Sequence, residues 1–237
     1  TEFVDADRFL SPDISLSQYQ NILISYTPIP YLSELEKSQY DLHRDRILYL
    51  FDNLTNRVSH DKPSFVFIHL IAPHPPFVFD KYGNFIEAER PYSITDGSGF
   101  LQHGGSVDEY ISQYRGQIEY INQLTQNAVQ EIIDSYENKK PVIVIQGDHG
   151  PGSKTHWNLV EKTDMHERFS ILNAVYIPEN DTNQFYKTMT PINTFRILTN
   201  NFYNTNLPLT YDSSYFSTFS YPYSFYNVTD KLNRSEK

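Results

Sequence analysis

The chain has no cysteine, no long hydrophobic run and no excess of positive charge. Without cysteine it can build neither a disulfide framework nor a thiolate metal site. No apolar stretch approaches the roughly 18 residues that cross a bilayer, and no signal-peptide pattern is present. The 19 lysines and arginines against 29 aspartates and glutamates give a formal net charge of −10. This balance argues against nucleic-acid binding, which needs basic patches to displace phosphate counterions.

What is present is the composition of a folded protein. At 237 residues, 39% hydrophobic and 20% charged, the chain is long enough to bury one sizeable core. Hydrophobic periodicity predicts helices over 38–54, 108–136 and 191–202, strands over 64–71, 141–145 and 169–178, and a long loop over 80–106. Helices that alternate with apolar strands predict an α/β layered domain with a mostly parallel central sheet flanked by helices. Residues 1–237 are expected to form a single domain.

The most informative motif is Asp148-His149, which directly follows the apolar run 141–145. A run of this kind is typical of a strand buried on both faces, so the pair is expected at the carboxyl end of a central strand, where ligands of α/β sheets bind. A carboxylate beside an imidazole can ligate one divalent ion such as Zn²⁺ or Mn²⁺. In the alternative interpretation, Asp148 caps a following helix and His149 is surface.

A second motif is His74, which lies in a proline-rich segment after the apolar run 64–71. Prolines end a strand and stiffen the turn, and rigid presentation suits a residue that meets a ligand at fixed geometry. The alternative is a structural turn with an incidental histidine. His69 lies inside the apolar run and is expected to be a hydrogen-bonded core residue, with a role behind a metal ligand left open.

Four motifs follow one another in an order that resembles a known family. They are His69-Leu-Ile-Ala-Pro-His74-Pro-Pro-Phe, Gln117-Ile-Glu-Tyr-Ile, Gly147-Asp148-His149-Gly150-Pro151 and Glu167-Arg168-Phe-Ser-Ile-Leu-Asn173-Ala. Together they resemble the C-terminal part of the sulfatase-like branch of the alkaline phosphatase superfamily, closest to the membrane-anchored sulfatase-like hydrolases and transferases of bacteria. The resemblance implies that Asp148 and His149 ligate the catalytic metal and that His74 contacts the transferred phosphate or sulfate group.

The resemblance is incomplete at the N-terminal side. Enzymes of this family begin with a strand that bears a metal-binding carboxylate, followed by a Ser, Thr or modified Cys nucleophile, and neither is recognised here. The chain is therefore expected to be the C-terminal portion of a longer protein. In that protein an upstream segment would carry the nucleophile, the other ligands and any membrane anchor, and the domain would face the extracytoplasmic side. The other possibility is a relative that has lost its chemistry.

The resemblance and the residues together predict a metal-dependent hydrolase or transferase of phosphate or sulfate esters, acting with one or two divalent ions (Mn, Zn, Mg or Ca). The substrate would be an anionic ester, with a cell-envelope glycan or lipid headgroup as candidates, and this segment alone is expected to be inactive. The alternative function is a non-catalytic module that binds a glycan or a partner protein.

Two further segments carry candidate contacts. The polar segment 150–168 is expected to line the same cleft as Asp148, with His156 and Trp157 as substrate contacts and His166 and Arg168 as groups that bind the oxyanion. The alternative is an exposed loop whose Arg168 pairs with a neighbouring carboxylate.

The tail 201–226 is rich in aromatic rings, which are expected to pack against the domain rather than to stack on a sugar or lipid headgroup. These rings belong to Tyr203, Tyr211, Tyr215, Phe216, Phe219, Tyr221, Tyr223, Phe225 and Tyr226.

Overall fold

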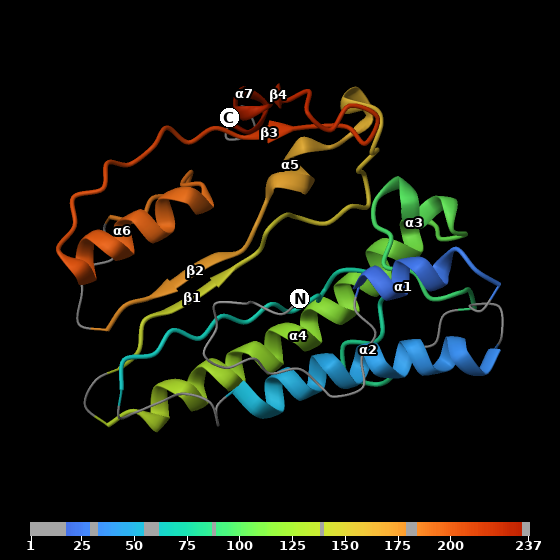
Figure 1. Cartoon of the computed structure of the whole chain (residues 1–237), viewed down its shortest axis with the longest axis horizontal. Coiled ribbons are helices and arrows are strands. Elements are labelled where there is room, and N and C mark those ends of the chain that lie inside the picture. The colour runs from blue at the N-terminus through green and yellow to red at the C-terminus, as the bar shows by residue number, and fades with distance from the viewer. Residues whose placement is uncertain are drawn as a thin grey trace. The chain divides into compact units, whose positions relative to one another are not determined.

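The computed structural model describes residues 18–28, 33–54, 62–86, 89–137, 140–178 and 184–233 (Figure 1). The chain divides into two compact units, Thr1–Tyr136 and Glu137–Lys237. Each unit is treated separately below.

The first unit is built on two long helices that lie side by side, α2 (Ser33–Leu54) and α4 (Val107–Ser135). Two shorter helices, α1 (Gln18–Ser25) and α3 (Ser98–Gln102), belong to the same unit. The sequence pattern correctly predicts α4, because a capping box formed by Ser106 and Glu109 starts it and apolar side chains recur along one face. In the described part of the expected loop 80–106, the regular structure is α3 and the isolated bridge of Phe85 with Phe79.

Two clusters of buried side chains hold the first unit together. The larger one joins α2 and α4 to the segment after His74. Its buried members are Tyr40, Ile47, Val78, Phe79, Tyr92 and Ile121. The smaller one places Phe77 against Phe100 and Tyr110, with ring centroids 5.9 and 5.1 Å apart. The segment 77–79 is therefore buried and packs against residues of α2, α3 and α4.

The expected strand over 64–71 does not join a sheet in the described part of the chain. Phe65, Val66, Phe67 and Ile68 are 42–79% exposed, and His69 is exposed rather than part of the core. The run has the composition of a buried strand, but a strand needs a ladder of paired backbone groups, and neither the sheets nor the bridge of the described residues include this run. The prediction of a core histidine at position 69 is wrong for the same reason.

In the second unit, β1 (Ile143–Gln146) pairs with β2 (Asn173–Tyr176) in antiparallel register, Ile143 opposite Tyr176 and Gln146 opposite Asn173. The second strand pair, β3 (Tyr215–Phe216) with β4 (Tyr226–Asn227), is also antiparallel. A mostly parallel sheet is therefore not what the described strands form. A parallel pair needs a crossover, usually a helix laid along the sheet. The chain after β1 instead makes η3 (Val160–Lys162) and α5 (Met165–Phe169) and returns directly alongside β1.

Helix α6 (Pro191–Tyr203) begins with Pro191 at its first turn and holds the extended chain that follows it. Asn193 accepts from the N–H of Thr210 (3.0 Å) and donates to its carbonyl oxygen (2.9 Å). Asn200 makes the same pair of bonds with Leu207, at 2.7 and 2.9 Å. Arg196 donates to the carbonyl oxygen of Pro208 between them (2.8 Å).

The two asparagines fit this task because of their spacing. Seven helical residues span about 10 Å, and three residues of extended chain span about the same distance. Positions 193 and 200 of the helix therefore match positions 210 and 207 of the tail, which runs in the opposite direction. We call this arrangement of Asn193, Arg196 and Asn200 the asparagine clasp.

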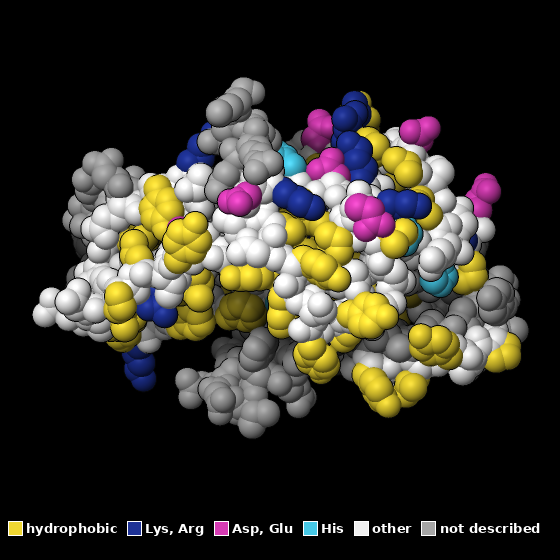
Figure 2. All heavy atoms as spheres, turned by 90° about the horizontal axis from the view of Figure 1, so that it is seen from above, with side chains coloured by type: hydrophobic (Ala, Val, Ile, Leu, Met, Phe, Trp, Pro, Cys, Tyr) yellow, Lys and Arg dark blue, Asp and Glu magenta, His cyan; other side chains and the backbone are white. Residues whose placement is uncertain are grey.

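The aromatic tail does not pack as expected. Phe216 is buried with Met165 and Val228, but the other eight rings named above are exposed, up to 90% for Tyr223. Figure 2 looks down on the side where β3, β4 and α7 (Thr229–Asn233) lie, and hydrophobic side chains are visible on this face. The strands in the tail are only two residues long, so they form no broad apolar sheet face that could bury these rings.

Candidate functional site

The motif Asp148-His149 follows β1 after a single glycine. The N–H of His149 donates to Oδ1 of Asp148 (3.0 Å), and Nδ1 of His149 lies 2.9 Å from the carbonyl oxygen of Gly150. A hydrogen bond at this distance requires the proton on Nδ1, which leaves Nε2 with its lone pair for a ligand. Nε2 lies 3.7 Å from Oδ2 of Asp148, and the Asp148 side chain is 84% exposed. An ion about 2 Å from each atom would reach both.

No helix begins within the residues that directly follow Asp148. The interpretation of this carboxylate as a helix cap is therefore wrong. The backbone N–H that donates to it belongs to its own neighbour His149, not to a helix.

Arg168 braces the loop that carries the two candidate ligands. The N–H of Gly150 donates to the carbonyl oxygen of Arg168 (2.7 Å), and Nη1 of Arg168 donates back to the carbonyl oxygen of Gly150 (3.0 Å). The guanidinium also lies over the ring of Trp157, 4.9 Å from its centroid. Arg168 was expected to bind an oxyanion, but these contacts engage it with the protein itself. Arg168 holds the loop of the candidate ligands, and its role in binding an oxyanion stays a prediction.

Glu167 holds the same loop at Ser153 and Lys154. Its carboxylate accepts hydrogen bonds from the hydroxyl of Ser153 and from the N–H of Lys154 (2.8 Å). Asp164 caps the first turn of α5 by accepting from the N–H of Glu167 (3.1 Å). Residues of the short helix α5 thus anchor the loop 150–154 at both ends.

The remaining candidates of the second unit are Trp157, His156 and His166. Trp157 is stacked on Phe219 of the tail, with centroids 4.8 Å apart, while Arg168 covers it by a cation–π contact. His156 is half-buried, and its Nδ1 accepts from the N–H of Asn158 (3.3 Å). His166 is exposed on α5. Their roles as substrate contacts stay predictions.

In the first unit, α4 positions the loop of His74 through one buried side chain. Gln117 is fully buried, and its Oε1 accepts from the N–H groups of Val78 (2.7 Å) and Phe79 (3.3 Å). Its Nε2 donates to the carbonyl oxygen of His74 (3.4 Å). Nδ1 of His74 lies 2.7 Å from the carbonyl oxygen of Pro75, so the Nδ1–H tautomer is favoured here as well.

Asp96 is a candidate that the sequence analysis missed. It is buried, accepts a hydrogen bond from the hydroxyl of Tyr110 (2.7 Å), and offers a carboxylate oxygen within 4.8 Å of a ring nitrogen of His74. A buried carboxylate near an imidazole can orient it or share an ion with it. The only signal in the sequence was the location of Asp96 in the long loop 80–106, since loops of that length are often functional.

His43 is a second histidine near His74 in the same unit. His43 of α2 is buried, its ring faces Tyr92 with centroids 6.1 Å apart, and its Nε2 has no hydrogen-bond partner in the described part of the chain. Burial, together with the positive charge of Arg46 and the neighbouring His74, lowers the pKa of His43 from 6.5 to about 4. His43 is therefore neutral at physiological pH.

The family model of the sulfatases matches residues 10–220, which is most of the chain. The chain belongs to the sulfatase family. No curated protein and no solved structure matches it significantly. Membership of the sulfatase family is compatible with the described architecture, which is helical in the first unit and combines helices with two antiparallel strand pairs in the second.

Among the described helices of this sulfatase-family chain, none is both long and apolar enough to span a membrane. Chemically, the second unit offers a carboxylate and an imidazole on a braced loop, and the first unit offers an imidazole on a loop fixed by Gln117. A sulfatase-family domain supports hydrolase or transferase chemistry on an anionic ester, and such enzymes bind a divalent metal.

Proposed function

We propose that this sulfatase-family protein is a metal-dependent hydrolase or transferase of phosphate or sulfate esters. The observation that carries the proposal is the pair formed by Asp148 and His149, whose donor atoms lie 3.7 Å apart on a loop held by Arg168. The donor set fits a divalent ion, because one ligand is an exposed carboxylate and the other is an imidazole whose Nδ1 is already engaged. Two ligands do not complete a site, so the ion needs further ligands from other residues.

The bound ion would supply Lewis-acid stabilisation of the ester oxygens and lower the pKa of the attacking group. Asp148 also brings negative charge, which offsets the positive charge of the ion. His149 keeps its Nε2 directed at the ion because Gly150 holds the other nitrogen. His74 binds a non-bridging oxygen of the transferred group through Nε2, since Pro75 engages its Nδ1. The nucleophile is not assigned to any residue of this chain.

The experiment measures bound metal in the longest native form of the protein. Asp148→Asn keeps the size of the side chain and removes its charge, and His149→Gln removes the imidazole. Asp230→Asn, on the exposed face of α7, is the matched control. We expect stoichiometric metal in the wild type and the control, and a clear loss in both site variants. Activity is then measured with 4-nitrophenyl sulfate and 4-nitrophenyl phosphate.

Metal retained at full stoichiometry in the Asp148→Asn and His149→Gln variants would refute the assignment of these ligands. Absence of metal from the complete wild-type protein would refute the enzyme and favour the second candidate.

The second candidate is a non-catalytic module that binds a glycan or a partner protein. The exposed aromatic rings of the tail favour it, because such rings can stack on sugars or anchor a protein interface. Residues 201–228 carry a single charged side chain, Asp212. A partner that covers this surface therefore removes few charged groups from water. Under this alternative, Asp148→Asn leaves partner binding intact.

A further inference from the structure

The carbonyl oxygen of Gly150 serves two side chains of the second unit. It lies 2.9 Å from Nδ1 of His149 and accepts a hydrogen bond from Nη1 of Arg168 at 3.0 Å. A carbonyl oxygen has two lone pairs, so it can accept both hydrogen bonds at once. The direction of this carbonyl bond decides how the imidazole of His149 is turned and which of its nitrogens carries the proton. Arg168 therefore acts on His149 by fixing the acceptor that the imidazole uses.

The side chain of Arg168 is in turn placed by an aromatic ring. Its guanidinium carbon lies 4.9 Å from the ring centroid of Trp157. An arginine side chain has many rotamers, and a cation–π contact favours those that keep the guanidinium over the ring. Trp157 thus limits the positions from which Arg168 reaches the carbonyl oxygen of Gly150.

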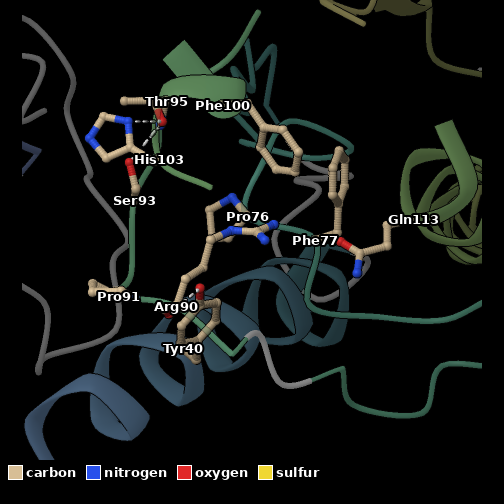
Figure 3. A pocket seen from close by; sticks show the side chains of 10 residues that line it. All are labelled: Tyr40, Pro76, Phe77, Arg90, Pro91, Ser93, Thr95, Phe100, His103 and Gln113. Carbon is tan, nitrogen blue, oxygen red and sulfur yellow. Dashed lines mark hydrogen bonds between the residues drawn. The ribbon is translucent and has the colours of Figure 1, made fainter. Parts of the chain in front are cut away.

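The first unit offers a comparison, because there too a guanidinium lies over a ring. Arg90 lies 4.7 Å from the centroid of Phe100, beside a small pocket (Figure 3). Both of its terminal nitrogens donate to the carboxylate of Glu109, at 3.1 and 2.5 Å. Two charge-assisted bonds fix the plane of that guanidinium without help from the ring. The bond from Arg168 to Gly150 ends on an uncharged oxygen, so it depends more on how the ring places the donor.

Trp157 is attached to the aromatic tail by stacking and by hydrogen bonds. The ring of Phe219 lies nearly parallel to it, with 4.8 Å between the centroids and an interplanar angle of 11°. The N–H of Phe219 donates to the carbonyl oxygen of Trp157 (3.0 Å). At the next residues, Oδ1 of Asn158 accepts from the N–H and the hydroxyl of Ser220, at 3.1 and 2.8 Å. Two segments that lie far apart in the sequence are therefore joined at two successive positions.

The exposure of Phe219 shows that this contact is not part of a hydrophobic core. Phe219 is 68% exposed, nearly the same as Phe225 in the same tail (66%). Within the described residues, Phe225 has no ring partner, whereas Phe219 is stacked on the only tryptophan of the chain. A ring that buries little apolar area adds little to the stability of a core. What Phe219 contributes is the position of Trp157.

We propose that the tail sets the orientation of the candidate metal ligand His149, with Phe219 as the positioning residue. Phe219 holds Trp157, which holds the guanidinium of Arg168. The guanidinium fixes the carbonyl oxygen that keeps His149 in its Nδ1–H tautomer, with the lone pair on Nε2. The proposal rests on the proposed function in one respect, because the aim of Nε2 matters for the chemistry only when an ion is bound. Moving the tail away from Trp157 would therefore weaken metal binding.

The first test reads the tautomer of His149 in the longest native form of the protein, freed of metal, by NMR of isotope-labelled histidine at alkaline pH. His149→Gln identifies the signal. We expect the Nδ1–H form in the wild type and a mixture with the Nε2–H form in Phe219→Leu, which keeps an apolar side chain but loses the stacked ring. Phe219→Tyr restores a ring and should restore the wild-type tautomer. Phe225→Leu, the equally exposed control, should leave the tautomer unchanged.

The second test titrates the same metal-free proteins with Zn²⁺. We expect Phe219→Leu to raise the Kd about tenfold, the effect typical of residues that orient a metal ligand from behind. Phe219→Tyr and Phe225→Leu should bind Zn²⁺ as the wild type does.

A second variant keeps the proposal testable if Phe219→Leu melts early. Asn158→Ala removes the acceptor of Ser220 and leaves both rings in place, and it should give the same mixture of tautomers with a smaller rise in Kd. An unchanged tautomer in both Phe219→Leu and Asn158→Ala would overturn the proposal. An equal change in Phe225→Leu would also overturn it, because the effect would then not depend on the stack.

The proposed function fails separately. If the tautomer responds to Phe219→Leu as expected but the complete wild-type protein binds no Zn²⁺, the positioning contacts stand and the metal assignment fails. If Asp148 and His149 are needed for Zn²⁺ binding but the tautomer does not respond to Phe219→Leu, the metal site stands and the tail has no part in it.

Discussion

Replacing Gly150 with alanine is expected to destabilise the second unit by roughly 3 kcal/mol. A Cβ at this position would overlap the carbonyl oxygen of Glu167 and lie 2.7 Å from that of Ser170. Both are backbone atoms around α5, so neither can turn aside as a flexible side chain could. The loop or the helix must move by about 1 Å to restore a normal separation, which is a typical case of overpacking.

The magnitude has two sources. Overpacking of a well-packed site costs about 1–3 kcal/mol. The movement also weakens the reciprocal hydrogen bonds between Gly150 and Arg168, at 2.7 and 3.0 Å, each worth about 1 kcal/mol. Against this, alanine restricts the unfolded chain and returns about 0.5 kcal/mol. The sum is close to 3 kcal/mol.

Gly147 provides the matched control, because it flanks the same Asp148-His149 pair on the other side. A Cβ there would meet nothing closer than 3.6 Å, an ordinary contact with Ile171. Gly147→Ala should therefore be neutral or slightly stabilising, by about 0.5 kcal/mol.

The assay is urea unfolding followed by the fluorescence of Trp157, the only tryptophan of the chain, which lies in the second unit. Metal content is measured in parallel, and Gly150→Ala should lower it while Gly147→Ala should not. Equal unfolding midpoints for the two variants would refute the argument that α5 fixes the position of this loop.

Three further changes test other contacts. Gln117→Leu leaves the buried N–H groups of two loop residues unpaired and should cost about 3 kcal/mol, measured by urea unfolding followed by circular dichroism, whereas the exposed Gln123→Leu should change little. His43 binds a proton more weakly in the folded state, so stability should be full above pH 6.5 and fall by about 3 kcal/mol as the pH drops toward 4, and His43→Leu should remove that fall. Asn193→Leu should free the N–H of Thr210, and hydrogen exchange at that amide should then match an unprotected one; protection equal to the wild type would contradict the asparagine clasp.

The sequence predicts well the elements whose signals are local. Helix α4 carries its own capping box and its own apolar period, and α6 carries a proline at its first turn. The strand over 64–71 has the same quality of local signal, but its state depends on a distant pairing partner, which composition does not specify. The antiparallel pairing of β1 with β2 depends likewise on the path of the 26 or so intervening residues, since the register follows from where α5 returns the chain.

The candidate site shows the same division. Asp148 and His149 are neighbours in sequence, so their proximity was predictable, while Asp96 approaches His74 only because Tyr110 and the helix α4 hold it there. The chemistry of Arg168 was inferred from residue type alone. Its observed contacts with Gly150 and Trp157 depend on three separate segments and could not be predicted from any one of them.

The asparagine clasp has a consequence for how this chain can change over evolution. Asn193, Arg196 and Asn200 bind main-chain atoms of Leu207, Pro208 and Thr210, and the hydroxyl of Thr210 also donates to Asn193. The side chains of Leu207 and Leu209 make none of these hydrogen bonds, so they can be replaced without loss of the attachment, and Pro208 is compatible because only its carbonyl oxygen is used. The helix therefore fixes the path of this segment, while its two exposed leucines, Leu207 and Leu209, are open to substitution.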